Sequence, residues 1–116
     1  MSALGIKKSL ALGQPTKLND TVVTGTGTID FYCPVHSNSD CDFSAIFQVV
    51  GTLTSLTAAL QVSLDGSTFN DLVASASFLT TSAPLKVVTP VFSGGATFRI
   101  NITALTGSQD FYVAIN

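Results

Sequence analysis

The side chains best suited to chemistry gather in one short segment of the chain. Cys33, His36 and Cys41 offer two thiols and an imidazole, with Asp40 and Asp42 beside them. Thiolates and imidazole are ligands that zinc prefers, but a structural zinc site needs a fourth ligand, and the spacing matches no common zinc module. A Cys33–Cys41 disulfide, which would contribute about 2–3 kcal/mol in the chain-entropy model, is favoured over free thiols, and both are favoured over a metal site. We therefore predict no metal ligands.

The sequence favours no catalytic group. His36 is the only histidine, and as a general base it would need an orienting partner and a nucleophile. Ser37 and Ser39 lie nearby, but the segment is rich in turn-forming residues, which do not hold a nucleophile in a fixed position. No glycine pattern is followed by a helix that could bind a phosphate. We predict that the protein is not an enzyme and has neither catalytic residues nor a cofactor.

The composition points to contact with other proteins. Charged residues make up 10% of the 116 residues, the formal net charge is −2, and the mean hydropathy is +0.48. Repulsion between copies is therefore weak, and part of the surface is expected to lie against another protein. The basic residues are scattered and form no stripe along which a phosphate backbone could lie, so we expect no nucleic-acid partner: Lys7, Lys8, Lys17, Lys86 and Arg99.

Neither a membrane span nor an export signal is expected. No apolar run approaches the roughly 20 residues that cross a bilayer. Near the N-terminus two lysines are followed by only a short apolar patch, residues 10–12, which is too short for the hydrophobic region of a signal peptide. We expect synthesis in the cytoplasm and no membrane partner.

The spacing of apolar residues predicts an all-β fold. Apolar and polar residues alternate in several short runs separated by turn-forming residues, and no window has the period of a helix. Seven to eight such strands are typical of an antiparallel β-sandwich or jelly roll. We assign this domain to residues 21–116. Residues 1–20, which Gly5, Gly13 and Pro15 interrupt, are expected to form an extended N-terminal arm.

Residues 56–73 are predicted to form the hairpin that organises the fold. Asp65-Gly66 favours a two-residue type I′ turn, which would place Phe69 opposite Val62 and Val73 opposite Ala58 on the buried face. Asp71 would then face inward opposite Leu60, so a bulge at Asn70-Asp71, or the end of the strand there, is expected.

Four further features mark the limits of strands. Gly51 is expected to close a central strand over residues 43–50, and Thr106-Gly107-Ser108 is expected to be a turn. Pro90 cannot donate a ladder hydrogen bond, which places its strand at an edge of the sheet or ends the pairing there. Residues 74–83, whose bulky members are Phe78 and Leu79, are predicted to form a loop or a weak edge strand.

One segment resembles a known group of proteins. Residues 60–72 carry the pattern S-x-D-G-x-x-aromatic-x-x-L, and the late strands over residues 97–102 and 111–115 follow it. Roughly the C-terminal half of the chain thus resembles small β-sandwich proteins of tailed bacteriophage virions, which serve as capsid decoration (cement) proteins, tail components or fibre modules. The resemblance implies a structural virion protein.

Among these roles a capsid decoration protein is favoured, binding the major capsid protein outside a phage head as a homo-oligomer, with a trimer preferred. Candidate contacts with the shell are Ile6, Lys7, Lys8 and Leu10 in the arm. The alternatives are a phage tail or baseplate component, and a β-sandwich module that binds a receptor or glycan. A similar S-x-D-G-x-x-W hairpin occurs in discoidin-like carbohydrate-binding domains, but this chain has no Trp, which weakens the glycan alternative.

Overall fold

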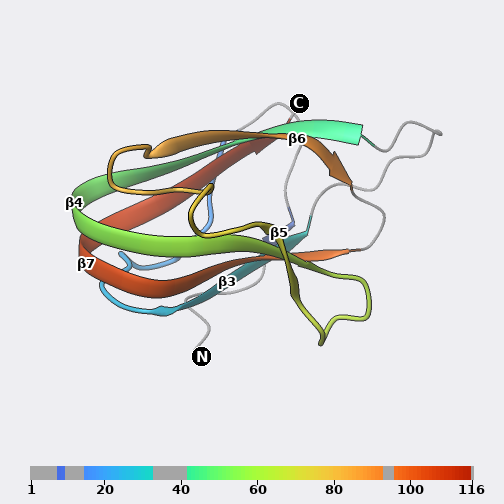
Figure 1. Ribbon diagram of the computed structural model, residues 1–116, viewed down its shortest axis with the longest axis horizontal. Coiled ribbons are helices and arrows are strands. Elements are labelled where there is room, and N and C mark those ends of the chain that lie inside the picture. The colour runs from blue at the N-terminus through green and yellow to red at the C-terminus, as the bar shows by residue number, and fades with distance from the viewer. Residues whose placement is uncertain (1–7, 10–14, 33–41, 93–95, 116) are drawn as a thin grey trace.

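The described part of the protein is entirely β. The computed structural model describes residues 8–9, 15–32, 42–92 and 96–115, which form one seven-stranded sheet and no helix (Figure 1). The sheet curls into a half-barrel, and every strand pairing is antiparallel except that of β1 with β3. The prediction of an antiparallel all-β fold is thus confirmed. The strands are β1 (Lys8–Ser9), β2 (Thr16–Lys17), β3 (Gly27–Tyr32), β4 (Asp42–Ser63), β5 (Asn70–Val73), β6 (Leu85–Phe92) and β7 (Thr97–Ile115).

Two long bent strands form the frame of the sheet. β4 and β7 pair from Ala45↔Ile115 to Ser63↔Thr97, and both fold back at the end drawn on the left of Figure 1. The sequence-based expectation that a strand ends at Gly51, and that residues 106–108 form a turn, is therefore wrong. Each position lies inside a strand, where it bends.

The bend depends on glycine at two positions. Gly51 has a φ of 141° and Gly107 has a φ of 115°. Residues that carry a side chain rarely adopt these positive values. A Cβ atom at Gly51 would collide with the carbonyl oxygen of Ser108, and one at Gly107 would collide with that of Thr52. The two backbones approach each other too closely at the bend for any side chain.

A buried amide completes the bend. Gln109 is 1% exposed. Its side-chain amide is oriented so that both the oxygen and the nitrogen have suitable partners, and the nitrogen then donates to Ser108 O at 3.1 Å and to Thr52 O at 3.0 Å. The Val23 and Gln109 backbones also exchange hydrogen bonds of 2.8 and 3.0 Å. Polar groups exposed by the change in strand direction are thus paired inside the protein.

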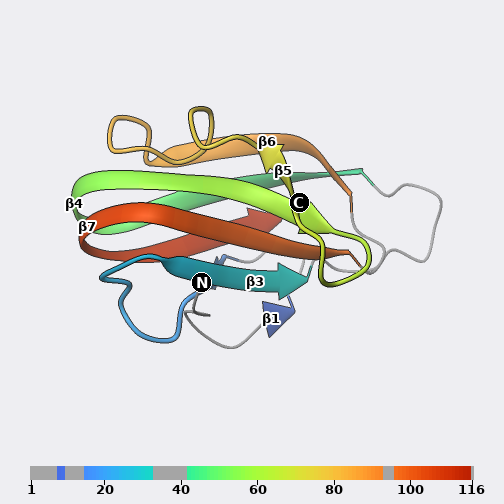
Figure 2. The same ribbon diagram turned by 60° about the horizontal axis from the view of Figure 1, so that its bottom comes forward.

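The bend divides the sheet into two halves that face each other. The first, the β6 half, contains β6, the start of β4, the end of β7 and β2. The second, the β3 half, contains β5, the end of β4, the start of β7, β3 and β1. β6 and β3 lie on opposite sides of the molecule in both ribbon views (Figure 2). Within the described residues β6 pairs only with β4, which confirms the edge position predicted from Pro90.

Aromatic side chains fill the space between the halves. Phe31 on the β3 half lies 6.0 Å from Phe47 on the β6 half, measured between ring centroids, and 5.7 Å from Phe98. Phe78 packs edge-on against Phe47 at 5.3 Å. Phe78 and Leu79 belong to a segment of turns and bends between β5 and β6, so the loop alternative was the right one. Both side chains are fully buried, and the loop therefore closes part of the core.

The described parts of the N-terminal segment pair with the chain's own sheet. β1 runs beside β3, and β2 pairs with β7. Leu18 is buried in the core, and the Asn19 carboxamide accepts from Phe111 N at 2.8 Å. The division between arm and domain at residue 20 stays a prediction.

Candidate interaction surfaces

A loop at the end of β4 is held by a single carboxylate. We call residues 64–69 the Asp65 loop. Asp65 Oδ1 accepts hydrogen bonds from Ser67 N at 2.9 Å, Thr68 N at 2.7 Å and the Ser63 hydroxyl at 2.8 Å, and Ser63 Oγ accepts from Gly66 N at 2.9 Å. The backbone hydrogen bonds from Thr68 and Ser67, followed by that of the Ser63 hydroxyl, hold the pKa of the Asp65 carboxyl well below its usual value. The loop conformation is thus fixed by local hydrogen bonds.

This arrangement replaces the predicted two-residue turn. Asp65 does have the turn-forming role expected of it, and Gly66 has a positive φ of 84°. However, the carboxylate takes the N–H groups of Ser67 and Thr68, which therefore do not pair across the hairpin. The next strand begins only at Asn70. The prediction of a type I′ hairpin was wrong because it considered backbone geometry and left out the Asp65 side chain as an acceptor.

The longer loop changes the register of the hairpin. Val62 pairs with Asn70 instead of Phe69, and Leu60 pairs with Val73. The register shifts between Leu60 and Gln61, so a bulge is present, one residue beyond the expected position, with Leu72 as the extra residue. The bulge was expected because Asp71 could not be buried, and Asp71 is indeed exposed.

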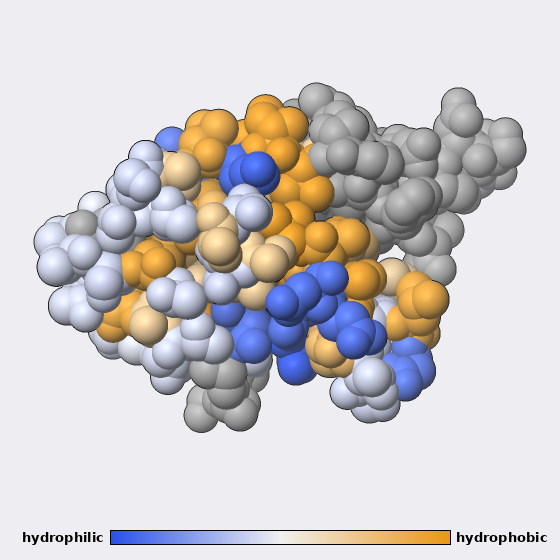
Figure 3. All heavy atoms as spheres, in the orientation of Figure 1, coloured by the Kyte–Doolittle hydropathy of each residue, from blue (hydrophilic) through white to orange (hydrophobic). Residues whose placement is uncertain are grey.

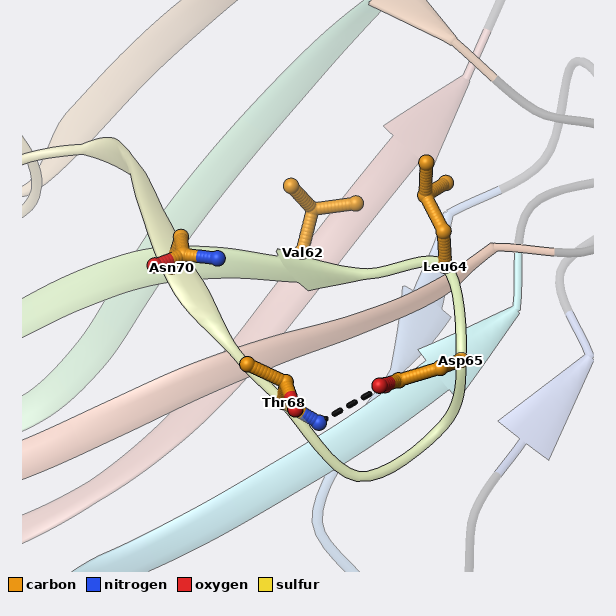
Figure 4. Close-up of a pocket in the computed structure, with 5 residues that line it drawn as sticks. All are labelled: Val62, Leu64, Asp65, Thr68 and Asn70. Atoms are coloured by element: carbon orange, nitrogen blue, oxygen red, sulfur yellow. Dashed lines mark hydrogen bonds between the residues drawn. The ribbon is translucent and has the colours of Figure 1, made fainter.

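A pocket of about 340 Å³ lies beside the Asp65 loop (Figure 4). Val62 and Leu64 extend their side chains to the same side of the chain, while Thr68 and Asn70 come from the segment that crosses in front. Leu64 is 89% exposed. Leu64 is thus a largely exposed aliphatic residue in the lining of this pocket, and Val62 is the other apolar lining residue.

A row of polar side chains crosses the outer face of the β3 half. Strand register aligns Asp71, Gln61, Arg99 and Asp30 on four adjacent strands, and we call them the polar row. Gln61 Nε2 donates to Asp71 Oδ1 at 2.9 Å. Arg99 binds Asp30 with two hydrogen bonds, from Nε at 2.7 Å and Nη2 at 3.0 Å. These bonds raise the pKa of the Arg99 guanidinium, and two-point contacts of this kind also fix geometry.

Arg99 also contacts Phe69, the last residue of the Asp65 loop. Its Cζ atom lies 3.7 Å from the centroid of the Phe69 ring, within the range of a cation–π contact. Phe69 is half-buried on this outer face, although the sequence placed it on the inner face. The polar row was not predicted, because nothing in the sequence aligns four strands that are far apart along the chain.

The outer face of the β6 half carries several exposed aliphatic side chains. Ala45, Phe47 and Val49 of β4 are buried, and the residues between them point outward. Ile46 pairs with Val87 on β6. The exposed apolar side chains, which we call the aliphatic face, are Ile46 (37% exposed), Val50 (47%), Leu85 (51%) and Val87 (52%).

The ion pair of this half lies on the side away from β6, and β6 itself carries Lys86. Lys17 Nζ lies 3.6 Å from Asp110 Oδ1, and both belong to the β2 and β7 side of the half. In the view of Figure 3, hydrophilic residues gather where β5 and the loop before it lie, and hydrophobic residues gather along the side of β6. The two halves thus differ in what they present to solvent.

The residues singled out for chemistry fall mostly outside the described residues. Cys33, His36, Asp40 and Cys41 all do, so the disulfide stays a prediction. Of the candidate shell contacts, Ile6, Lys7 and Leu10 also do, while Lys8 belongs to β1. Within the described ranges there is no group of three or more His, Cys, Asp or Glu that could hold a metal ion. No helix in that part of the chain is long and apolar enough to cross a membrane.

In comparisons with known proteins, no family model, no curated protein and no solved structure matches this chain.

Proposed function

We propose that the protein is a structural virion protein, a capsid decoration protein that binds the major capsid protein on the outside of a phage head. It would be made in the host cytoplasm and join the virion as a homo-oligomer, with a trimer favoured. The virion setting rests on the resemblance of residues 60–72 and the late strands, and the sandwich or jelly-roll class rests on the number and spacing of the short predicted strands. The proposal includes neither enzymatic activity, nor a cofactor, nor nucleic-acid or membrane binding.

The observation that carries the proposal is the aliphatic face. Four apolar side chains, each between 37% and 52% exposed, lie on the outer face of β4 and β6, with the exposed Gln48 between Ile46 and Val50. Contiguous apolar surface of this kind marks sites of protein contact, whereas apolar residues scattered singly do not. In this proposal the aliphatic face lies against the shell, and the N-terminal arm adds a second contact.

A matched pair of variants tests the role of this face. Val87→Asp would place an unpaired carboxylate in the contact, so binding to empty heads of the phage is expected to weaken at least about tenfold. Val22→Asp is the control, because Val22 is 51% exposed and Val87 is 52% exposed, yet Val22 lies outside the aliphatic face. Binding is measured by co-sedimentation with purified heads. Equal binding by both variants would show that the aliphatic face is not the contact.

The number of bound copies separates this function from its alternatives. Hundreds of copies per head support decoration, and a few tens of copies per virion would indicate a tail or baseplate component. Saturable binding on a glycan array without other phage proteins would instead indicate a receptor-binding module.

Truncation tests the arm independently. Removing residues 1–15 leaves β2 and the buried Leu18 in place, so the sheet is expected to fold while head binding is lost. Normal binding by the truncated chain would exclude the arm, with Ile6, Lys7, Lys8 and Leu10, as a contact.

A further inference from the structure

The Asp65 loop contains a reactive pair of neighbouring residues. Asp65-Gly66 is the only Asp-Gly step in the sequence. In such a pair the backbone nitrogen of the glycine can attack the Cγ atom of the aspartate, because glycine has no side chain to obstruct it. A C–N bond forms, the carboxyl OH and the proton of the nitrogen leave as water, and the product is a cyclic succinimide. Water then opens the ring at either carbonyl, which gives back aspartate or yields isoaspartate.

Conversion to isoaspartate would disrupt this loop. The residue keeps all its atoms, but the backbone then runs through the former side-chain carbonyl and is longer by a methylene group. The carboxylate moves to the former main-chain position. The N–H groups of Ser67 and Thr68 would thus lose Asp65 Oδ1, to which they donate at 2.9 and 2.7 Å (Figure 4). A converted loop could not re-form these bonds.

One buried hydroxyl engages both reacting groups. Ser63 is 2% exposed, and its Oγ accepts from Gly66 N at 2.9 Å and donates to Asp65 Oδ1 at 2.8 Å. The attacking nitrogen must release its proton, which Ser63 engages. Attack also needs the neutral carboxylic acid, since a carboxylate repels a nucleophile. The hydrogen bonds from Thr68 N, Ser67 N and the Ser63 hydroxyl hold the pKa of the Asp65 carboxyl well below its usual value and so favour the carboxylate.

The two reacting residues are exposed, yet the loop that carries them is held at both ends. Ser63 pairs with Thr97 in the sheet at one end, and Phe69 lies 3.7 Å from the Arg99 guanidinium at the other. The reaction therefore requires a local opening that breaks the hydrogen bonds of the loop. Its rate should follow the population of the open loop, as the rates of other reactions of opened segments do.

We propose that Asp65 is a latent isoaspartate site, which the closed loop protects and which local opening of the loop exposes to conversion. Among the groups that hold the loop, the Ser63 hydroxyl bonds to both reactants, so Ser63 is the protecting residue. The inference concerns the chemistry of a single chain and does not rest on the proposed function.

The test follows isoaspartate in the full-length protein at neutral pH. Samples are taken over weeks from the folded chain and from the same chain unfolded in guanidinium chloride. The peptide that contains Asp65 is isolated after proteolysis, and electron-transfer fragmentation distinguishes isoaspartate from aspartate, which has the same mass. The unfolded chain is expected to accumulate isoaspartate at Asp65, and the folded chain to do so at least about tenfold more slowly.

A matched pair of serine variants locates the protection. Ser63→Ala removes the hydrogen bonds to Gly66 N and Asp65 Oδ1, and it should speed conversion in the folded chain several-fold. Ser67→Ala is the control, because Ser67 bonds to Asp65 through its backbone N–H, which the substitution retains, and it should leave the folded rate unchanged. Each variant is compared with its own unfolded chain, which corrects for any change in the intrinsic rate. Circular dichroism melting curves check folding.

Three results would overturn the inference. They are an unfolded chain in which Asp65 forms no isoaspartate, a folded wild-type chain that converts as fast as the unfolded one, and a folded Ser63→Ala chain that converts as slowly as the wild type. The first two need no variant, so the inference is tested even if Ser63→Ala does not fold. None of these results bears on head binding, which the Val87→Asp and Val22→Asp pair measures separately.

Discussion

The outer faces of the two halves of the sheet are both built on β4 and β7, but they expose different kinds of side chain to solvent. On the β3 half the polar row pairs within the chain, through Arg99 with Asp30 and Gln61 with Asp71. On the β6 half the corresponding outward positions of β4 are Ile46, Gln48 and Val50, all exposed, and two of the three are aliphatic.

This difference indicates which half is available to a partner. A polar face whose groups already bind one another gains little from a new contact, because their hydrogen bonds would only be exchanged. An aliphatic face gains roughly 25 cal/mol for each Å² of apolar area removed from water. Both halves contribute buried apolar residues to the core, so the contrast lies in the outer residues.

The largest expected effect comes from removing the bend that creates two halves. Gly107→Val would force a side chain into the Thr52 carbonyl at a positive φ, and we expect unfolding or a loss of more than about 4 kcal/mol. Gly25→Ala is the control, since a Cβ atom there has nothing within 4 Å, and it should change stability by less than about 1 kcal/mol. Urea unfolding measures both. A stable Gly107→Val protein would mean that the halves do not need this close approach.

The ion pairs of the two halves offer a second contrast. Arg99→Ala removes a two-point ion pair whose side chains are 27% and 21% exposed, together with the Phe69 contact, and should cost about 2 kcal/mol. Lys17→Ala removes a 3.6 Å pair in which Lys17 is 43% exposed, and should cost less than about 0.5 kcal/mol. Chemical denaturation compares the two variants. Equal losses would contradict the view that the β3 half is the internally bonded one.

The sequence contains the alternation that specifies the strands, but it does not show how far they continue. Gly51 and Gly107 resemble strand ends, because glycine is common in turns. Their effect depends on each strand lying against the other at the bend, which is a contact between distant segments. The all-β class, the edge position of β6 and the bulge near Asp71 follow from local rules and could be predicted.

The surfaces were harder to predict than the fold. Ile46 and Val50 made the strand over residues 43–50 apolar on both faces, which is typical of a strand buried on both sides. In the structure that strand is central but buried on one face only. The exposure of Leu64 could not be predicted either, because it follows from the length of the Asp65 loop.

The aliphatic face should be dispensable for folding. Ile46→Thr and Val87→Thr keep the branched shape that favours strands and remove exposed apolar surface. Each is expected to change the free energy of unfolding by less than about 0.5 kcal/mol, as exposed sites usually do, while head binding weakens. Denaturation and co-sedimentation on the same preparations test this. A loss of several kcal/mol would show that the face supports the fold itself.

The smallest expected effect is the pH dependence of the Asp65 loop. The usual pKa of the carboxyl is 3.8, and hydrogen bonds from Thr68, Ser67 and Ser63 lower it in the folded protein. A lowered pKa means that the charged form is favoured by folding, so its contribution is complete above the unfolded pKa and is lost only as pH falls through the folded one. NMR titration of the Asp65 carboxyl carbon should therefore give a midpoint below 3.8, with the Ser67 and Thr68 amide signals moving at the same pH. A midpoint at or above 3.8 would mean that the carboxylate does not hold the loop, and the positioning of Leu64 would need another cause.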